Sequence, residues 1–412
     1  MLMRELPNLM QLRAFLRVAQ HESVSRAADT LYRAQSVVTR AIRDLELRLG
    51  APLFERHANG MRLTAQGACI RPRAQRALDD LNRVPSLLDV PHKVAVEPLY
   101  LLHTRRLEIF IKLCDTHHMQ TVASLFGLTQ PAVSAAIKVL EGGTGTLLFE
   151  RSPKGLLPTR AGREMSVSVR RAVNELRHLD SDLAALNGQL EGRVAVGALP
   201  LCRTTMLPDA VLRLISAHPG VQVVTNESAF ETLATDLRYG DLDFILGALR
   251  PSGYASDLYG ETLLTEELLV VARAGHPLSD RKLVMKDLHD AQWILPRTGS
   301  PSRELFDQHL AQAGQTLPRA AVETGDLAVI RGLLMNSDLL AVVSAHQMDY
   351  ELASHALAPL DIPLTGTKRS IGLIQRNGAL PSPAAIALMT AIRSVASGLP
   401  ISSSDARDQS AL

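Results

Sequence analysis

The chain has 412 residues, of which 46% are hydrophobic and 21% charged, a composition that excludes a disordered protein and allows two to four domains. Its opening residues lack the apolar core of a signal peptide and no later run reaches the ~18 apolar residues of a membrane helix, so we expect a cytoplasmic protein with no membrane partner. Its cysteines, Cys69, Cys114 and Cys202, have neither CxxC nor metal-ligand spacing, which predicts free thiols, no metal site and no cofactor.

The charge is unevenly divided along the chain. Residues 1–191 contain 26 Lys and Arg against 19 Asp and Glu, whereas the remaining residues contain 18 against 23. Because Lys and Arg that neutralise phosphates supply most non-specific affinity for nucleic acid, this division slightly favours a polyanion-binding N-terminal half. Random scatter of charge is the alternative.

The N-terminal half contains one segment twice. Leu12–Gly67 recurs 95 positions later as Leu107–Gly162 without an insertion or deletion, and the run LFER recurs whole at 53–56 and 148–151. Two copies are too few for a solenoid, so each must fold as a module. Further identical pairs are Phe15/Phe110, Ala28/Ala123, Gln35/Gln130, Val38/Val133, Ile42/Ile137, Leu45/Leu140, Glu46/Glu141, Gly50/Gly145, Gly60/Gly155, Thr64/Thr159 and Gly67/Gly162.

In the first copy we expect a second helix over Ser23–Leu31 and a third over Gln35–Leu49, whose exposed face carries Arg40 and Arg43. Beyond it a shorter helical stripe is cut off by prolines, and residues 85–98 are expected to connect the two copies. The stripe and the prolines are Ile70, Ala74, Leu78, Leu81, Pro85 and Pro91.

In the second copy, amphipathic spacing predicts a first helix over Arg106–Thr116 and a short second helix over Thr121–Phe126. Gly127 suits the sharp reversal after it, and Thr129 is placed to cap a third helix. Helix, glycine turn and helix form a helix-turn-helix arrangement.

The third helix of the second copy begins with Gln130 and Pro131, and a proline is tolerated in the first turn. Its exposed face would carry Gln130, Ser134 and Lys138, residue types that reach base edges and phosphates. Gly142 and Gly143 each cost ~1 kcal/mol in a helix interior, so this helix is predicted to end early.

The segment after the third helix predicts a small β-hairpin, or wing. LFER is followed by the loop 153–155 and then by Leu156–Thr159, and Arg151 on this hairpin is placed to meet a backbone phosphate.

Beyond the hairpin, apolar residues recur every three or four positions, as in the seam of a coiled coil. This seam lies between domains with no other partner in sequence, which favours pairing of two chains; core packing is the alternative. Its residues are Val169, Val173, Leu176, Leu179, Leu183, Leu186 and Leu190.

From Gly192 onward, strands and helices alternate, which predicts βαβ units with mostly parallel sheets in two small lobes around a cleft. The expected strands are 193–198, 221–226, 243–248, 267–272, 293–296, 320–324 and 339–344. The expected helices are 207–217, 230–239, 302–313, 326–335 and 384–395.

The runs LTQPAVSAAIKVLEGGTGTLLFERSPKGLLPTRAG and SVSRAADTLYRAQSVVTRAIRDLELRLGAPLFERHANGMRLTAQG resemble the winged helix-turn-helix of LysR-type transcriptional regulators. The second half resembles the effector domain of that family, with the stretch AGHPL at 274–278 in a familiar position. Most of the family carries one such head, so the duplication is a departure. So are Tyr32 and Arg33, which occupy a turn where the family usually has a small polar or Gly residue followed by a hydrophobe.

The resemblance implies a multidomain fold with two all-α/winged helix-turn-helix domains, a linker helix that pairs protomers, and a two-lobed α/β effector domain like a periplasmic binding protein. The boundaries we expect are a first head at 7–64, a short helix and connector at 68–101, a second head at 102–159, a linker dimerisation helix at 162–190, an effector domain at 192–396 and a flexible tail at 397–412. Lobe one would be 192–267 with 372–396, and lobe two 268–371.

By the same resemblance, each third helix reads DNA and each wing arginine holds a phosphate. We rank the first copy as the stronger phosphate binder and the second as nearer to the family's base-reading pattern; a degenerate, purely structural copy is the alternative. The residues are Gln35, Ser36, Thr39, Arg40, Arg43 and Arg56 in the first copy, and Gln130, Pro131, Ser134, Lys138 and Arg151 in the second.

An effector is expected at strand ends and helix N-termini, where free N–H groups favour an anion. Several arginines among these residues suggest a carboxylate or phosphate ligand, and the resemblance points to a sugar, a sugar acid or an aromatic carboxylate. The candidates are Leu199, Arg203, Thr204, Thr205, Arg297, Thr298, Gly299, Ser300, Ser302, Arg303, Gly325 and Asp326.

The expected function is a ligand-responsive, sequence-specific regulator that binds double-stranded promoter or operator DNA as a homodimer or homotetramer and controls bacterial metabolic or uptake genes. One alternative is a catalytic α/β domain tethered to DNA, although residues 192–396 show no GxSxG, HExxH or P-loop and no Cys/His nucleophile arrangement. The other is an effector domain that has lost its ligand and serves only in assembly. We expect no enzymatic activity.

Overall fold

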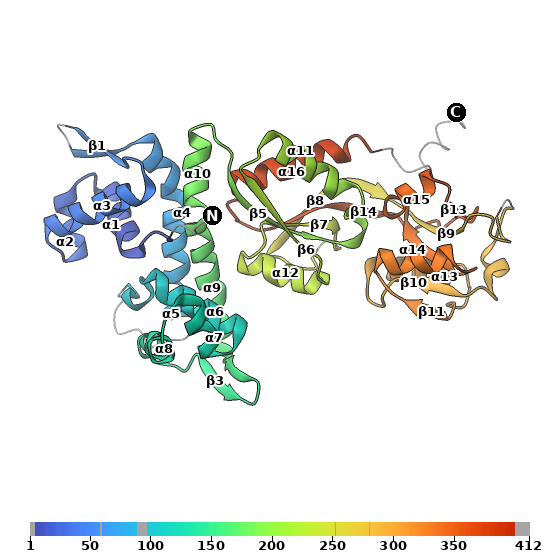
Figure 1. Ribbon diagram of the computed structural model, residues 1–412, viewed down its shortest axis with the longest axis horizontal. Helices are drawn as coiled ribbons and strands as arrows, with labels where there is room; N and C mark the ends of the chain where they lie inside the picture. The colour runs from blue at the N-terminus through green and yellow to red at the C-terminus, as the bar shows by residue number, and fades with distance from the viewer. Residues whose placement is uncertain (1–4, 58–59, 89–96, 252, 280, 400–412) are drawn as a thin grey trace. The chain divides into compact units, whose positions relative to one another are not determined.

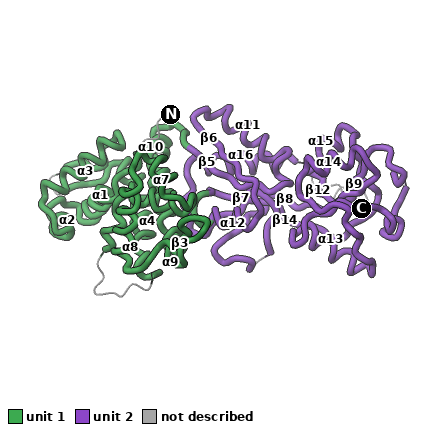
Figure 2. The backbone as a smooth tube through the Cα atoms, turned by 60° about the horizontal axis from the view of Figure 1, so that its bottom comes forward, with its two compact units in different colours: residues 1–192, 238–241 green, residues 193–237, 242–412 purple. Residues whose placement is uncertain are grey.

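The computed structural model describes residues 5–57, 60–88, 97–251, 253–279 and 281–399. These divide into two compact units, shown in different colours in Figure 2: unit 1 is Met1–Gly192 with Arg238–Asp241, and unit 2 is Arg193–Leu237 with Leu242–Leu412. Pro91, most of the predicted connector and most of the predicted flexible tail lie outside the described residues.

Unit 1 begins with three helices and a hairpin. Asn8 and Ser23 cap the first two helices through their side chains, and the hairpin is antiparallel. The predicted second and third helices of this copy are confirmed. The elements are α1 (Leu9–His21), α2 (Val24–Leu31), α3 (Gln35–Leu49), β1 (Phe54–His57) and β2 (Gly60–Leu63), followed by α4 (Ala65–Asn82), α5 (Val84–Leu87) and the 3-10 turn η1 (Leu99–Leu101).

The same series follows in the second copy, again with an antiparallel hairpin. Thr129 caps the third helix as predicted, because its side chain accepts a hydrogen bond from the Ala132 amide. The elements are α6 (Thr104–Thr116), α7 (Met119–Phe126), α8 (Gln130–Thr144), β3 (Phe149–Ser152), β4 (Gly155–Pro158), α9 (Arg160–Arg177) and α10 (Leu179–Leu186).

The prediction that the third helix of the second copy ends early is wrong. Helix α8 runs through Gly142 and Gly143 to Thr144 and has 15 residues, as α3 has. Buried Leu140 and Thr144 anchor this last turn, and the Tyr100 ring lies so close to Gly143 that a Cβ there would meet ring carbons at 2.2 Å. Tertiary packing therefore outweighs the low helix propensity of the two glycines.

The prediction of a shorter helical segment after the first copy is confirmed, because α4 is followed only by the four-residue α5, whereas α9 is followed by the eight-residue α10. Helix α4 has 18 residues, the same number as α9, and it continues through Pro72. The predicted linker at 162–190 is divided, because α9 ends at Arg177 and α10 begins at Leu179.

Helices α4 and α9 pack against each other (Figure 1). Cys69 contacts Asp182, and Arg76, further along α4, contacts Glu175, which precedes Asp182, so the two segments run antiparallel. The apolar seam of α9 and α10 is buried in this contact, from Val169 at 0% to Leu183 at 6% exposure. From Val169 to Leu183, the seam that was predicted to pair two chains is therefore covered by the chain's own α4 in a core that both copies share, whereas Leu186 is 46% exposed.

Unit 2 contains two five-stranded sheets. The sheet of lobe one has the order β6-β5-β7-β14-β8, with β5 and β7 parallel and β14 antiparallel to both neighbours. These strands are β5 (Gly192–Ala198), β6 (Val221–Asn226), β7 (Phe244–Ala248), β8 (Leu258–Glu266) and β14 (Arg369–Arg376). The chain leaves lobe one after β8 and returns at β14, close to the predicted crossings.

The sheet of lobe two has the order β11-β10-β12-β9-β13, parallel from β11 to β12 and antiparallel beyond. Its strands are β9 (Leu268–Arg273), β10 (Trp293–Leu295), β11 (Ala320–Glu323), β12 (Leu340–Ser344) and β13 (Leu357–Pro359). Both sheets are thus mixed, whereas mostly parallel sheets were predicted. The prediction did not include β8, β13 and β14, which pair antiparallel with their neighbours.

The five helices predicted in the two lobes are confirmed within about two residues, whereas the short helix at 349–353 was not predicted. In lobe one the helices are α11 (Met206–Ala217), α12 (Phe230–Tyr239) and α16 (Pro383–Ala396), with the 3-10 turn η2 (Pro200–Cys202). In lobe two the helices are α13 (Pro301–Gln312), α14 (Leu327–Met335) and α15 (Asp349–Ala353), with the 3-10 turns η3 (Met285–Leu288) and η4 (Ala345–Gln347).

Over the described part of the chain, no single helix has both the length and the apolar character needed to cross a membrane. The pair α7 and α8, which meet at a bend of 106°, passes that test only when the two helices are taken together.

Candidate DNA interface and effector site

The third helix of the first copy turns one face inward and one outward. Val38, Ile42 and Leu45 are buried against the core, whereas all five predicted reading residues of this helix are exposed: Gln35, Ser36, Thr39, Arg40 and Arg43. The Thr39 hydroxyl donates to the Gln35 carbonyl oxygen at 3.0 Å, and Arg40 Nε lies 3.7 Å from Asp44 Oδ2. This face combines amide, hydroxyl and guanidinium donors, the groups that contact base edges and phosphates.

The third helix of the second copy presents a different face on the same plan. Gln130, Pro131 and Lys138 are exposed and Ser134 is half-buried. Arg40 of the first copy corresponds to Ala135 of the second, and both positions are exposed. The wing arginines, Arg56 on β1 and Arg151 on β3, are exposed.

The residues that the two copies share hold the wing to the third helix. Glu46 Oε1 accepts a hydrogen bond from the Leu53 amide at 2.7 Å, and Glu141 Oε1 accepts from the Leu148 amide at 2.9 Å. The rings of Phe15 and Phe54 lie 5.4 Å apart between centroids, and Phe110 and Phe149 repeat this contact at 5.7 Å. These repeated residues thus give both copies the same scaffold, whereas the exposed faces of the two third helices differ at several positions.

The repeated wing glycines are required by a close approach of two backbones. The Met61 amide donates to the Glu22 carbonyl oxygen at 2.8 Å, and the Leu156 amide donates to the His117 carbonyl oxygen at 2.8 Å. The residue before each amide is a glycine. A Cβ would lie 2.4 Å from the Glu22 oxygen at Gly60 and 2.5 Å from the His117 oxygen at Gly155, which is too close for any other residue. Each hairpin is therefore fastened to the end of its first helix.

In unit 2, the loop after β5 carries four of the candidate effector residues. Leu199 is buried in the core of lobe one, whereas Arg203 is partly exposed. Arg203 donates from Nε to the Ala198 carbonyl oxygen at 2.8 Å and from Nη2 to the Glu227 carbonyl oxygen at 3.0 Å. Burial lowers the pKa of Arg203, and among the described residues no carboxylate lies within ion-pair distance of its guanidinium.

The other two residues of this loop connect the lobes. The Thr204 hydroxyl donates to the His346 carbonyl oxygen at 2.9 Å, and the Thr205 hydroxyl lies 3.4 Å from Asp349 Oδ2. Asp349 in turn lies 3.6 Å from His346 Nδ1. The chain's own residues therefore hold the two lobes together at this point.

The candidates in lobe two are engaged by the chain's own carboxylates. The Thr298 amide donates to Glu323 Oε1 at 2.7 Å, and Arg303 Nε donates to Asp307 Oδ1 at 2.9 Å. Asp326 caps α14 by accepting from the Ala328 and Val329 amides. The expected free N–H groups are thus already bound to carboxylates at Thr298 and at the start of α14, which disfavours an anion at these two places.

The remaining lobe-two candidates lie around the start of α13. Arg297, Thr298 and Gly299 are exposed before the helix, and Ser300 caps it by accepting from the Arg303 amide at 3.4 Å. Gly325 is partly exposed before α14. Among the described residues, no carboxylate lies within ion-pair distance of the Arg297 guanidinium.

A buried cluster that was not predicted from the sequence lies where the chain crosses between the lobes. Arg369, the first residue of β14, donates from Nε to Glu266 Oε1 at 2.9 Å and from Nη1 and Nη2 to Ser302 Oγ and Ser344 Oγ, each at 2.5 Å. Glu266 is only 1% exposed. A charged residue beside the predicted crossing at Ile371 was the available signal, because a buried charge requires a partner.

A cavity of about 340 Å³ beside the sheet of lobe one was not predicted either. Strands β5 and β7 are parallel neighbours, so Arg250, which follows β7, lies at the same sheet edge as the loop after β5. Its guanidinium carbon lies 3.9 Å from the Phe230 ring centroid, and burial lowers its pKa. Tyr254 and Tyr259 also line the cavity. The position directly after a predicted strand was the signal for Arg250.

Comparison with known proteins agrees with this architecture. The family described as "Bacterial regulatory helix-turn-helix protein, lysR family" matches residues 9–68 and again 104–163, and the family described as "LysR substrate binding domain" matches residues 187–397. The chain is 62% identical over 391 residues to the "HTH-type transcriptional regulator GalR" of Pseudomonas putida, covering 95% of this chain and 98% of that protein. It is 29% identical over 298 residues to the transcriptional regulator PcaQ of Agrobacterium fabrum, covering 72% of this chain and 95% of PcaQ.

Two solved structures share the fold. A variant of full-length OxyR from Pseudomonas aeruginosa superposes with a TM-score of 0.55 at 22% identity, covering 70% of this chain and 94% of OxyR. CbnR, a LysR family regulator, superposes with a TM-score of 0.52 at 21% identity, covering 71% of this chain and 99% of CbnR. From its helix-turn-helix elements, its two-lobed second unit and these matches, we conclude that the chain belongs to the LysR family and is a ligand-responsive, DNA-binding transcriptional regulator.

Proposed function

We propose that this regulator carries two DNA-reading heads in tandem, and that both contact double-stranded promoter or operator DNA. The observation that carries the proposal is the pair of exposed third helices, α3 and α8, which are equal in length and held by the same wing contacts. The family match to both copies supports it. Against a degenerate second copy, α8 is intact and keeps Gln130 and Lys138 exposed.

A footprint with single substitutions tests whether both heads read bases. Gln35→Ala and Gln130→Ala should each reduce discrimination between operator and random DNA by ~1–3 kcal/mol, because a lost bidentate contact to a base costs that much. Leu47→Ala, at an exposed site on the far end of α3, is the control and should leave the footprint unchanged. If one glutamine can be removed without any change in protection, that copy does not read bases.

We also propose that the effector is a small carboxylate bound in lobe one at the carboxyl ends of β5 and β7. Arg203 and Arg250 are partly buried cations at this edge, and Arg250 stands among the rings of Phe230 and Tyr254. Cations and ring walls together favour an aromatic carboxylate over a sugar acid, and either over a neutral sugar. The chain would bind this ligand rather than transform it, as the regulator names of its relatives support.

A thermal-shift screen of aromatic carboxylates, sugar acids and neutral sugars tests this second proposal. Aromatic carboxylates should raise the melting temperature, and Arg203→Gln or Arg250→Gln should abolish the shift. Arg213→Gln, on an exposed face of α11, is the matched control and should retain it. A lack of response to every compound would favour the alternative in which this unit serves only in assembly.

We also propose that the protein forms a homodimer or homotetramer. We propose a cytoplasmic location, because bacterial promoter DNA lies in the cytoplasm. Contacts between chains would use surfaces other than the seam of α9, since that seam is buried within one chain.

A further inference from the structure

The pairing of α4 with α9 determines how the two heads of one chain are oriented relative to each other. The two heads of one chain are attached to the starts of two antiparallel helices of equal length. Because corresponding helices of a repeat pair in opposite directions, the two heads are related by an approximate two-fold axis. In a homodimer this relation requires two chains; here both of the paired helices, α4 and α9, belong to one chain (Figure 1).

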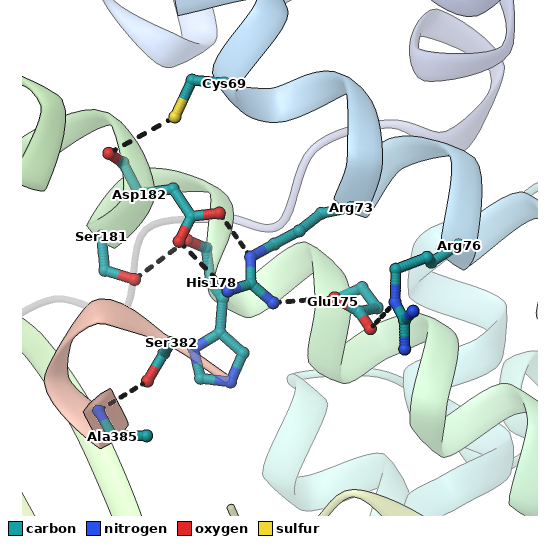
Figure 3. A network of polar contacts seen from close by, with 9 residues as sticks. All are labelled: Cys69, Arg73, Arg76, Glu175, His178, Ser181, Asp182, Ser382 and Ala385. Atoms are coloured by element: carbon teal, nitrogen blue, oxygen red, sulfur yellow. Dashed lines mark hydrogen bonds and ion pairs between the residues drawn. The ribbon is translucent and has the colours of Figure 1, made fainter. Parts of the chain in front are cut away.

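A buried ionic network lies in the contact between these helices (Figure 3). Arg73 of α4 is 1% exposed, and it bonds to Asp182 through Nε and, at 3.1 Å, through Nη2. Its Nη1 donates to Glu175 Oε2 at 2.8 Å, and Arg76 Nε donates to Glu175 Oε1 at 2.8 Å. Both carboxylates of the α9 and α10 side are therefore matched by arginines of the α4 side.

The network distinguishes the α4–α9 pair from pairs of like helices. The position 95 residues after Arg73 is Ser168, and the position 95 residues before Asp182 is Leu87. If two α9–α10 segments paired in this register, each Asp182 would face a serine in place of Arg73. Because a buried carboxylate without a cation is strongly unfavourable, the network selects pairing of unlike copies, as unmatched polar groups do at other specific interfaces.

The two reading faces that this pairing brings together are chemically different. Between α3 and α8, Ser36 corresponds to Pro131, Arg40 to Ala135 and Arg43 to Lys138. Base readout depends on such side chains at the exposed start of the helix, so two half-sites of the same sequence would suit only one of the heads.

We propose that one chain is a complete two-headed DNA-reading unit, and that its operator consists of two inverted half-sites of different sequence, one read by α3 and the other by α8. This inference rests on the proposed function, since it requires both heads to read DNA.

Selection of binding sites from random double-stranded DNA with the full chain tests the operator. We expect every strongly enriched sequence to contain two unlike half-sites at a fixed spacing. A palindromic consensus would overturn the inference while leaving DNA reading intact, and so would a consensus with one half-site. Failure to enrich any sequence would instead contradict the proposed function.

A transplant of the reading face assigns each half-site to its helix. Ser36→Pro, Val37→Ala, Thr39→Ser, Arg40→Ala and Arg43→Lys change only exposed positions of α3 into those of α8. The operator selected by this variant should become an inverted repeat of the half-site that α8 reads. If its two half-sites stay as unlike as those of the parent, the heads do not read one half-site each.

Co-production of two impaired chains tests whether the pair forms within one chain. One chain carries Arg40→Glu and Arg43→Glu in the first head, and the other carries Gln130→Ala and Lys138→Glu in the second. If each chain pairs its own heads, the mixture should protect no more than one half-site on a fragment that holds a single operator. Recovery of the full footprint would show that α4 pairs with α9 of another chain, and would overturn the one-chain unit.

Discussion

At the scale of single residues, the positions that the copies share are scaffold positions. Glu46 and Glu141 accept from wing amides, and Phe15 and Phe110 contact the wing phenylalanines. The exposed starts of α3 and α8 share Gln35 and Gln130 but differ at Ser36/Pro131 and Arg40/Ala135. The shared scaffold residues therefore give both heads the same fold, and the differences at the exposed starts of α3 and α8 make their outer faces chemically unlike.

Two neighbouring glycines of α8 should respond oppositely to alanine. A Cβ at Gly142 has no atom within 4 Å, so Gly142→Ala should raise the free energy of unfolding by ~0.5–1 kcal/mol through lower entropy of the unfolded chain. A Cβ at Gly143 would lie 2.2 Å from Tyr100 Cγ, so Gly143→Ala should lower it by ~1–3 kcal/mol. Denaturant unfolding measures both, and equal effects of the two substitutions would contradict the Tyr100 contact.

At the scale of elements, the α4–α9 contact depends on Arg73. Its burial alone would lower the pKa of the guanidinium, but the hydrogen bonds and charges of Asp182 and Glu175 outweigh burial and raise the pKa. Arg73 is therefore charged at any physiological pH. Burial raises the pKa of the Asp182 carboxyl, and the hydrogen bond and charge of Arg73 oppose that rise, so Asp182 depends on Arg73 to stay ionised in this contact.

Arg73→Met should lower the stability of unit 1 by ~3–5 kcal/mol, because it leaves Asp182 buried without its cation. Adding Asp182→Leu should recover most of this loss, since Glu175 keeps its bond to Arg76. Arg76→Met is the control: this arginine is about a third exposed and should contribute ~1 kcal/mol or less. Thermal unfolding of the parent protein and of these three variants measures the differences in stability. A double variant no more stable than Arg73→Met alone would contradict the charge argument.

At the scale of the whole molecule, each unit performs one part of the regulator's task. Unit 1 shares one hydrophobic core between both heads and the paired helices, so the heads have a fixed relation to each other. In unit 2, the lobes are joined by hydrogen bonds at Thr204 and by the buried cluster around Arg369. A ligand that changes how the lobes meet must compete with these contacts.

The lobe contact at His346 should make the stability of unit 2 depend on pH. The nearby Asp349 carboxylate raises the pKa of His346 above 6.5. A raised pKa means that the stabilisation is fully present below the unfolded pKa and is lost as the pH rises through the folded pKa. The melting temperature of unit 2 should thus fall above pH 6.5, and His346→Gln should flatten this part of the profile. An unchanged profile in that variant would exclude His346 as the cause.

Much of the fold was predictable because its signals are local. Helix α3 was predicted with both ends correct, and the cap at Thr129 and the βαβ alternation were also predicted. The reading residues were predicted from the exposed side of an amphipathic pattern, and the structure places all but Ser134 on an exposed surface. Arg369 was missed because its partners, Glu266, Ser302 and Ser344, are distant in sequence.

The sequence by itself determined that this protein repeats one head, that the head has the pattern of LysR-type regulators, and that a two-lobed unit follows. Those conclusions rest on spacing within short segments. Only the tertiary structure decided that α8 continues through two glycines and that α9 pairs with α4 of its own chain. Both outcomes depend on residues far away along the chain, Tyr100 over Gly143 and Arg73 beside Asp182, and a local pattern carries no information about which distant surface will cover it.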